Sequence, residues 1–407
     1  MHVLLDARPI LAAKTGDRSY WLGLCRSLPR ALPSWRFTVA LDGQPEPGLL
    51  PDLPNLDVAV APSPGGRLWP MVALPRLARR LGVDLVHLQY VAPPYLPCPF
   101  VTTVHDVSFA LYPHTFTRRD GTWLRTLVPP STRRAAAVIA DSRCTRGDLL
   151  RLYHLPPERV HTVSLGLDAG YQPDAEQAAA MRARYELPER YLLSVGVLQP
   201  RKNLTGLITA YAQARRDHGL REPLVVVGKT GWLAQPIFDR VAELGLTDQV
   251  RFLGYVPDDH LPGLYAGALL TLYPSIYEGF GLPPLESLAC GTPVLVSTTP
   301  ALAETAGPVA PSLPANDPGA WAAAMASLAV DDARRASLAK QGLAWAGAFT
   351  WERSARQHGE VYCAALRGRQ RTDETAHLLR SPANAHRLAD AISQLEAGHG
   401  QPHDLVD

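Results

Sequence analysis

The sequence predicts an α/β protein made of two doubly wound domains. Short apolar runs alternate with longer segments whose apolar residues recur every three or four positions, which indicates strand–helix–strand units with parallel sheets. This alternation occurs twice, and a segment rich in Ala, Glu, Arg and Pro (residues 167–190) separates the two series. With 407 residues, 46% of them hydrophobic, the chain is long enough for two domains with separate cores that face each other across a cleft.

The first series, residues 1–170, is expected to form a Rossmann-like domain. Its strands are expected at residues 2–6, 37–41, 84–88, 100–105, 138–141 and 161–163. Helical periodicity predicts helices over 18–32 and 68–81, and Ser142 is expected to cap a helix over 143–153. The basic stretch 67–80 suits either contact with an anionic membrane or a core helix with a solvated basic face.

The second series, residues 171–348, is expected to form a similar domain. Its strands are expected at 191–197, 223–227, 250–253, 268–273 and 293–297, with helices at 203–218, 236–245 and 258–265. Ala-rich helices fill 317–348, and an amphipathic helix follows within 349–368. Residues 369–407 have no strand pattern and look like an appended tail with one helix near 383–397.

Composition excludes several classes of protein. A net charge of +2 is too small for a surface that binds nucleic acid. The five cysteines form no C-x-x-C pair, which favours free thiols in a reducing compartment. No apolar run reaches the ~20 residues that span a bilayer, and the first residues do not look like a signal peptide. We therefore expect a cytoplasmic protein.

The most informative stretch is YPSIYEGFGLPPLESLACGT at residues 273–292. Glu278 is expected in the loop after a strand, and Glu286 in the first turn of the next helix, which the two prolines can open and Gly291 can end. In an open α/β sheet this carboxyl edge is where ligands bind. The alternative for Glu286 is a carboxylate that only interacts with the helix dipole.

A second basic feature follows the first strand of the second series. In VGVLQPRKNL, Arg201 and Lys202 precede Asn203, a candidate helix cap, so two cations and backbone N–H groups lie together in a pattern that suits a diphosphate. The alternative is that both cations are solvated charges beside a helix. The chain contains no Asp-x-Asp, so a metal held by paired aspartates is not expected, and these two cations are the candidate substitutes.

These two stretches resemble the C-terminal domain of family 4 retaining glycosyltransferases of the GT-B fold, including that family's Glu-x7-Glu motif. Further similarity, over roughly residues 1–366, comes from DARPI near the start, the loop at 14–20, TVHDVSF at 103–109, DSRCT at 141–145, VSLGLD at 163–168 and FLGYVPD at 252–258. The resemblance implies that the helix within 349–368 crosses back onto the first domain.

The resemblance also implies roles for individual residues. Arg201 and Lys202 would bind the donor diphosphate, Glu286 the ribose hydroxyls and Glu278 the donor sugar. His105 would be the active-site histidine, although a structural histidine at a strand end is the alternative, and Asp106 would orient it or contact the acceptor. The remaining donor-binding candidates are backbone positions: Gly279, Phe280, Gly281, Leu282 and Gly16.

The N-terminal loop departs from the family pattern. It reads Thr15-Gly16-Asp17-Arg18, so Gly16 still allows the backbone to approach a phosphate, but Asp17 brings a negative charge beside it. Transfer in this family is thought to occur on one face of the sugar, with the leaving phosphate helping to deprotonate the acceptor. We therefore assign no general base and expect no metal.

The substrate classes follow from the resemblance. We expect a hexose, mannose first, to be moved from a nucleotide sugar (GDP-mannose, or else a UDP-hexose) to a saccharide or lipid-linked acceptor in cell-surface glycan assembly. The alternatives are a disaccharide phosphorylase of the same fold and a non-catalytic scaffold that binds a sugar nucleotide or a toxin. No cofactor is expected beyond the donor.

The tail has a resemblance of its own. The sequence from Asp373 onward is similar to the toxin-contacting segment of Phd/YefM-type antitoxins, which would make a toxin its partner. The alternative is a terminal helix packed on its own enzyme or on a second copy.

Overall fold

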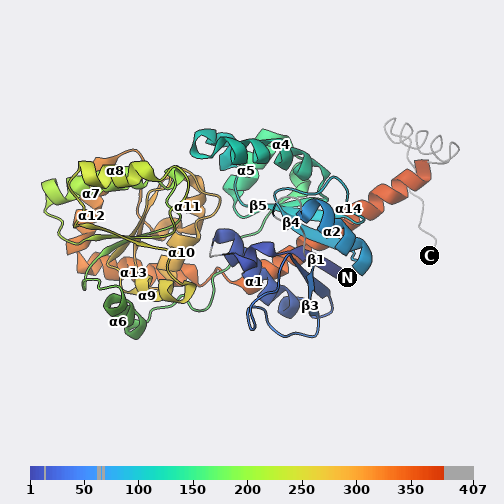
Figure 1. Ribbon diagram of the computed structural model, residues 1–407, viewed down its shortest axis with the longest axis horizontal. Helices are drawn as coiled ribbons and strands as arrows, with labels where there is room; N and C mark the ends of the chain where they lie inside the picture. Colours follow the sequence, from blue (N-terminus) through green and yellow to red (C-terminus); the bar gives the residue numbers. More distant parts are fainter. Residues whose placement is uncertain (13–14, 62–65, 67–68, 380–407) are drawn as a thin grey trace, which may run out of the picture.

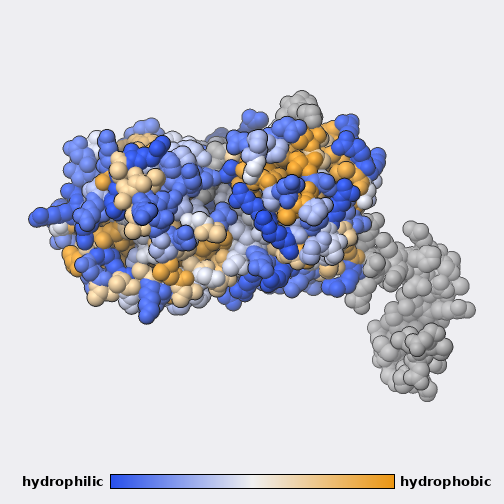
Figure 2. Space-filling view, turned by 90° about the horizontal axis from the view of Figure 1, so that it is seen from below, coloured by the Kyte–Doolittle hydropathy of each residue, from blue (hydrophilic) through white to orange (hydrophobic). Residues whose placement is uncertain are grey.

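The structure is a computed structural model that describes residues 1–379 apart from 13–14, 62–65 and 67–68. It consists of two parallel β-sheets, each covered by helices on both faces, and thus has the two-domain GT-B architecture (Figure 1). The predicted helix at 383–397 and most of the antitoxin-like sequence lie outside the described residues. Figure 2 shows hydrophobic residues gathered more densely on the N-terminal half of the face it presents.

The N-terminal sheet has the strand order β3-β2-β1-β4-β5-β6-β7, and all of its pairs are parallel. Its strands are β1 (His2–Asp6), β2 (Arg36–Leu41), β3 (Leu56–Val60), β4 (Leu85–Gln89), β5 (Phe100–Val104), β6 (Ala137–Ala140) and β7 (Val160–Thr162). The prediction missed β3, an edge strand whose partly exposed residues include Asp57, so that it lacks the apolar run of a buried strand.

The helices of this domain are α1 (Gly16–Ala31), α2 (Trp69–Leu81), α3 (Ser108–Leu111), α4 (Arg118–Arg134) and α5 (Arg143–Tyr153). Ser142 caps α5 as expected, because its side chain accepts a hydrogen bond from the Thr145 N–H. The prediction missed α4, whose Pro129 and Pro130 suggest a break in sequence terms. Each of these prolines removes one hydrogen bond to the carbonyl four residues earlier, and the helix nevertheless continues to Arg134.

The C-terminal sheet has the order β10-β9-β8-β11-β12-β13. Its strands are β8 (Leu192–Val195), β9 (Leu224–Val227), β10 (Val250–Gly254), β11 (Leu270–Tyr273), β12 (Val294–Ser297) and β13 (Ser312–Leu313). The two residues of β13 are too few for a recognisable pattern. The helices are α6 (Ala175–Arg184), α7 (Leu204–His218), α8 (Gln235–Glu243), α9 (Leu261–Ala266), α10 (Leu282–Ala289), α11 (Pro300–Thr305), α12 (Pro318–Val330) and α13 (Asp332–Ala346).

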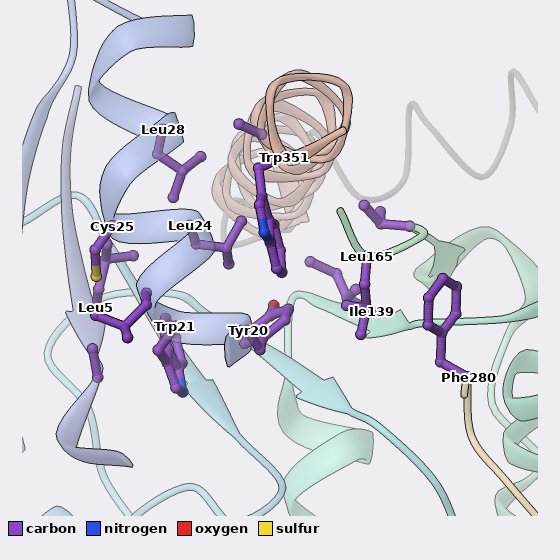
Figure 3. Close-up of a cluster of buried hydrophobic side chains, with 14 of the residues drawn as sticks. Leu5, Tyr20, Trp21, Leu24, Cys25, Leu28, Ile139, Leu165, Phe280 and Trp351 are labelled. Carbon is purple, nitrogen blue, oxygen red and sulfur yellow. The ribbon is translucent and has the colours of Figure 1, made fainter. Parts of the chain in front are cut away.

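The last described helix, α14 (Trp351–Leu379), returns to the N-terminal domain and packs along α1. Trp351 lies directly over Gly23, where an added Cβ would come within 2.1 Å of its ring, so a glycine is required for this contact. Figure 3 shows Trp351 beside Leu24 and Leu28, and Phe280 of the C-terminal domain reaches the same hydrophobic cluster. The expected crossover is therefore present and joins the two domains through one core.

This helix is longer than the pattern suggested. We expected it to end within 349–368, but its backbone continues without interruption to Leu379. All five cysteines are free, as predicted. Among the described residues, none of the helices has the length and apolar character needed to cross a membrane.

Candidate active site

The strand order brings Arg201, Lys202 and Glu278 together. Strands β8 and β11 are neighbours at the point where the order of the sheet reverses, and their carboxyl ends meet at one edge. Arg201 and Lys202 follow β8 in a short 3-10 helix (Pro200–Lys202), and Glu278 follows β11. Residues separated by some 75 positions thus share one site, as the sequence pattern predicted.

The three side chains form a buried ionic cluster. Glu278 accepts hydrogen bonds from Arg201 Nη1 at 2.8 Å and from Lys202 Nζ at 2.7 Å, one on each carboxylate oxygen. Burial disfavours the charge on Glu278, but Arg201 and Lys202 outweigh it and lower the pKa of this carboxyl from 4.5 to about 2. Burial lowers the pKa of Lys202 despite the opposing charge of Glu278. Glu278 is therefore an anion that holds two cations in place.

Backbone and ring contacts orient the two cations further. Arg201 Nη1 also donates to the Tyr277 carbonyl at 2.8 Å. Lys202 Nζ donates to the Tyr273 hydroxyl and lies 4.8 Å from the centre of that ring. Asn203 occupies the N-cap position of α7, but it does not cap the helix with its side chain as we expected. Its amide nitrogen donates instead to the carbonyls of Pro274 and Ala315.

Across the domain boundary, His105 directly follows β5. Its Nδ1 lies 2.6 Å from Asp141 Oδ2, and its Nε2 lies 3.7 Å from Asp17 Oδ1. Burial lowers the pKa of this imidazole, but the carboxylates, Asp141 first, outweigh burial and raise it to about 9. At neutral pH His105 therefore carries a positive charge and both ring nitrogens are donors.

The orientation of His105 corrects one of our expectations. Asp141, not Asp106, is hydrogen-bonded to the imidazole. Asp106 accepts hydrogen bonds from the Ser108 N–H and hydroxyl, and its Oδ2 lies 3.9 Å from Arg201. The reason is the sheet register: Val104 of β5 pairs with Ala140 of β6, so the next residues of both strands, His105 and Asp141, lie side by side. The acceptor-contacting role of Asp106 stays a prediction.

The glycine loop after Glu278 contacts the N-terminal domain. A Cβ added to Gly279 would lie 1.9 Å from the His105 carbonyl oxygen, so this backbone approach requires glycine. The Thr145 hydroxyl lies 3.2 Å from both the His105 and the Gly279 carbonyl oxygens. Nearby, the Glu304 carboxylate of α11 accepts hydrogen bonds from the backbone N–H groups of Arg143 and Cys144 at the start of α5, with N···O distances of 2.8 Å. The two halves of the candidate site are thus held in contact.

The next residues of the loop are largely structural. Gly281 has φ +106° and adjoins Leu302, while Leu282 is the first residue of α10. The Phe280 side chain is buried in the shared core against Phe349, and its carbonyl accepts a hydrogen bond from Thr305. Any contact of Phe280 with a donor must come from its backbone, as the sequence argument assumed.

Glu286 lies one turn deeper in its helix than expected. It is the fifth residue of α10, in the second turn, and the residue is buried. Tyr265 of α9 donates to its Oε2 at 2.9 Å, and the hydroxyl of Tyr171 also interacts with it, which helps raise the pKa of that tyrosine after burial. Glu286 is therefore a buried acceptor supported by tyrosines, and its role in binding ribose stays a prediction.

The N-terminal loop places Gly16 at the start of α1, where Thr15 caps the helix. A Cβ at Gly16 would meet nothing within 4 Å, so sterics do not require glycine there. Arg18 is paired with Asp258 of the C-terminal domain, which leaves Asp17 as the charged group of this loop nearest to His105. The negative charge noted in the sequence therefore does face the site.

The basic stretch at 67–80 contributes a mostly core helix. Trp69, Leu74 and Ala78 of α2 are buried, and Arg79 lies over the exposed ring of Tyr95 at 5.8 Å. In the part of the chain that the structure describes, no three His, Cys, Asp or Glu side chains are grouped so that they could hold a metal ion.

Three functional candidates escaped the sequence reasoning: Asp141, Tyr265 and Gln89. Asp141 could have been found, because it begins the DSRCT sequence and is the last residue of the predicted strand 138–141, just as His105 is the last residue of the predicted strand 100–105. Gln89 is the last residue of β4, the strand that pairs with β5 on the side opposite β6. Tyr265 gave no signal, because its contact with Glu286 depends on how α9 packs against α10.

Two family descriptions match consecutive parts of the chain. "Glycosyltransferase Family 4" matches residues 18–171 and "Glycosyl transferases group 1" matches residues 179–345. Both end before the tail with the antitoxin-like sequence, and the comparisons give that resemblance no support.

Similar proteins agree with these families. The chain is 33% identical over 264 residues to O-antigen chain mannosyltransferase B of Escherichia coli, covering 64% of this chain and 69% of that protein. It is 38% identical to D-inositol 3-phosphate glycosyltransferase of Salinispora tropica over 57% of this chain, but spans only 52% of that relative's length.

Solved structures share the fold at low sequence identity. Sucrose-phosphate synthase from Thermosynechococcus elongatus superposes with a TM-score of 0.71 at 23% identity, over 89% of this chain and 98% of that one. Anabaena HepE in complex with UDP-glucose gives a TM-score of 0.70 at 21% identity, over 89% and 99%. The two-sheet architecture, the family matches and the mannosyltransferase relative all agree. The chain therefore belongs to the family 4 glycosyltransferases of the GT-B fold.

Proposed function

We propose that this protein is a retaining glycosyltransferase that moves a hexose from a nucleotide sugar to a glycan acceptor. The observation that carries the proposal is the Glu278–Arg201–Lys202 cluster at the carboxyl edge of the second sheet, with the His105 carbonyl of the first domain against Gly279 of the same loop. Arg201 and Lys202 supply fixed positive charge for a departing diphosphate, which is the electrostatic assistance that this transfer needs. These cations take the part that a metal ion plays in other transferases.

Each residue then has a proposed task. Arg201 and Lys202 bind the diphosphate, and Glu278 holds both cations and lies on the side of the transferred sugar. Glu286, supported by Tyr265, accepts the ribose hydroxyls. Backbone N–H groups of the loop 279–282 approach the donor, with Gly279 fixing how closely the domains meet. His105 donates hydrogen bonds and is not a base, because its pKa of about 9 keeps it protonated at neutral pH.

Mannose, carried by GDP, is the first choice of donor. The relative that is a mannosyltransferase supports this choice, while the UDP-glucose bound by a structural neighbour keeps a UDP-hexose as the second. The acceptor that we propose is a growing cell-surface glycan or its lipid-linked precursor, reached from the cytoplasm at the inner face of the membrane. The exposed side chains of Val72 and Tyr95 beside basic helix α2 would meet that membrane.

The test combines binding with turnover. Calorimetric titration with GDP and UDP is followed by incubation with GDP-mannose or UDP-glucose and a neutral oligosaccharide acceptor, in the presence of EDTA. We expect transfer in EDTA, and NMR of the product should show that the anomeric configuration of the donor is kept. Failure to bind either nucleotide at millimolar concentration would refute the proposal and favour a non-catalytic scaffold. Release of a sugar phosphate from a disaccharide and inorganic phosphate would favour the phosphorylase.

A further inference from the structure

The backbone at the end of β4 has an unusual turn beside His105. Tyr90 has φ +54°, a left-handed conformation that a bulky side chain rarely adopts. The turn is closed across Tyr90 by a 2.6 Å hydrogen bond from the Val91 N–H to the Gln89 carbonyl. Strained backbone of this kind persists where the surrounding structure enforces it, and such positions cluster at functional sites.

Both side chains of this turn contact His105. The Gln89 amide nitrogen, Nε2, lies 2.6 Å from His105 Nε2. The Tyr90 ring lies 5.7 Å from the imidazole at an interplanar angle of 69°, an edge-to-face arrangement, and also packs edge-to-face on Phe109. The backbone strand before the turn is anchored, because the Tyr90 N–H donates to the Thr103 carbonyl at 3.0 Å. Two consecutive residues of this turn therefore both contact His105.

The charge state of His105 decides how Gln89 must be oriented. A doubly protonated imidazole donates from both nitrogens: Nδ1 to Asp141, and Nε2 to whatever faces it. Because an NH₂ group cannot accept this proton, a charged His105 requires the Gln89 amide to be turned over, so that Oε1 takes the place of the nitrogen recorded 2.6 Å from Nε2. The other ionisable groups around the ring are Asp17 at the start of α1, Asp106, which follows His105 in the chain, and Tyr20 of α1, whose ring centre lies 4.8 Å from that of the imidazole. Buried His87 and His358, whose pKa values are lowered first by burial, also interact electrostatically with His105.

We propose that Gln89 and Tyr90 are positioning residues for His105, and that the left-handed turn exists to place both against the imidazole. Gln89 fixes the ring through Nε2, opposite the bond from Asp141, and Tyr90 holds it from the side. A rotation of the ring about its Cβ–Cγ bond then costs two hydrogen bonds and the edge-to-face contacts with Tyr90 and Tyr20. The importance of this for transfer rests on the function proposed above, but the geometry of His105 can be measured without any substrate.

The experiment follows His105 by NMR of histidine-labelled, full-length protein, with its signal assigned from the spectrum of His105→Asn. Tyr90→Gly keeps the left-handed turn accessible but removes the ring, and Gln89→Met keeps the length of the side chain but removes its amide. We expect Gln89→Met to lower the His105 pKa from about 9 by about one unit, since the acceptor for the Nε2 proton is lost. We expect Tyr90→Gly to raise this pKa, since removing the ring relieves the burial that lowers it. We expect kcat for transfer to fall about tenfold or more.

Controls separate positioning from general damage. Tyr90→Phe keeps the ring and should keep the pKa. Glu186→Gly changes another non-glycine residue with positive φ (+51°), whose exposed side chain is remote from His105, and should match the wild type in both pKa and transfer. If Tyr90→Gly does not fold, Gln89→Met provides the same test at the other contact.

The possible results are distinct. We compare the His105 pKa with that of the wild type in whichever of Tyr90→Gly and Gln89→Met fold. If it is unchanged in all of them, the proposal is overturned, whatever their activity. A lowered pKa in Gln89→Met or a raised pKa in Tyr90→Gly, with no change in Glu186→Gly, supports it. If the wild-type protein transfers no sugar, the proposed function fails, while the titration still decides whether the turn positions His105.

Discussion

Replacing Glu278 by Gln removes the one carboxylate that bonds to both Arg201 and Lys202, while keeping the size of the side chain. The carboxyl pKa is 4.5 in an unfolded chain and about 2 in the folded protein, a difference that corresponds to about 3 kcal/mol of folding stability. Because the folded pKa is the lower one, this stability is present above pH 4.5 and is lost as the pH falls toward 2. At pH 7 the variant should lose about 3 kcal/mol.

Urea unfolding, followed by tryptophan fluorescence, measures this loss. The matched control is Glu222→Gln, which makes the same chemical change in a pair with Arg190, whose side chain is 45% exposed while that of Glu222 is 15% exposed. Such a pair contributes about 1 kcal/mol or less, so the control should be nearly as stable as the wild type. Equal stability losses in the two variants would refute the view that Glu278 compensates two buried cations.

The same variant separates binding from turnover. Without Glu278, Arg201 and Lys202 lack their shared counter-ion, so GDP or UDP should bind at least as tightly as to the wild type and should restore part of the lost stability. Transfer should nevertheless fall by about a hundredfold, because a group on the sugar side of the site is gone. A tenfold weaker diphosphate affinity, measured by calorimetry, would show that Glu278 does not compete with the ligand for these cations.

Three further predictions concern the groups around this cluster. The raised pKa of His105 stabilises the fold fully below pH 6.5, and this contribution should disappear between pH 6.5 and about 9; urea unfolding across this range should show the loss in the wild type and not in Asp141→Asn. Glu286→Gln should weaken GDP or UDP binding about tenfold in calorimetry while leaving pyrophosphate binding unchanged, because only the ribose contact is altered. Glu304→Gln weakens the bond to the start of α5 by about 1 kcal/mol, so small-angle scattering should show a larger radius of gyration without ligand.

Local sequence patterns were sufficient to predict those site residues that directly follow a strand or begin a helix. Arg201, Lys202 and Glu278 follow strands whose apolar runs are unmistakable, and parallel strands bring such residues to one edge. The edge strand β3 and the proline-containing helix α4 were missed, because a half-exposed strand and a helix with internal prolines both lack the periodic apolar signal. The prediction that the last helix ends near residue 368 was also wrong, because the backbone of α14 stays helical to Leu379.

The sequence by itself determined the two-domain α/β fold, the family and the pairing of cations with an acidic loop, because apolar periodicity and residue order decide these. Only the tertiary structure decided which groups meet. It placed Asp141 on His105 through strand register, turned Glu286 toward Tyr265 through helix packing, and brought Gly279 against the His105 carbonyl through contact between the domains. Contacts that depend on strand register, helix packing or the approach of two domains leave no local pattern, since they depend on where each backbone lies in space.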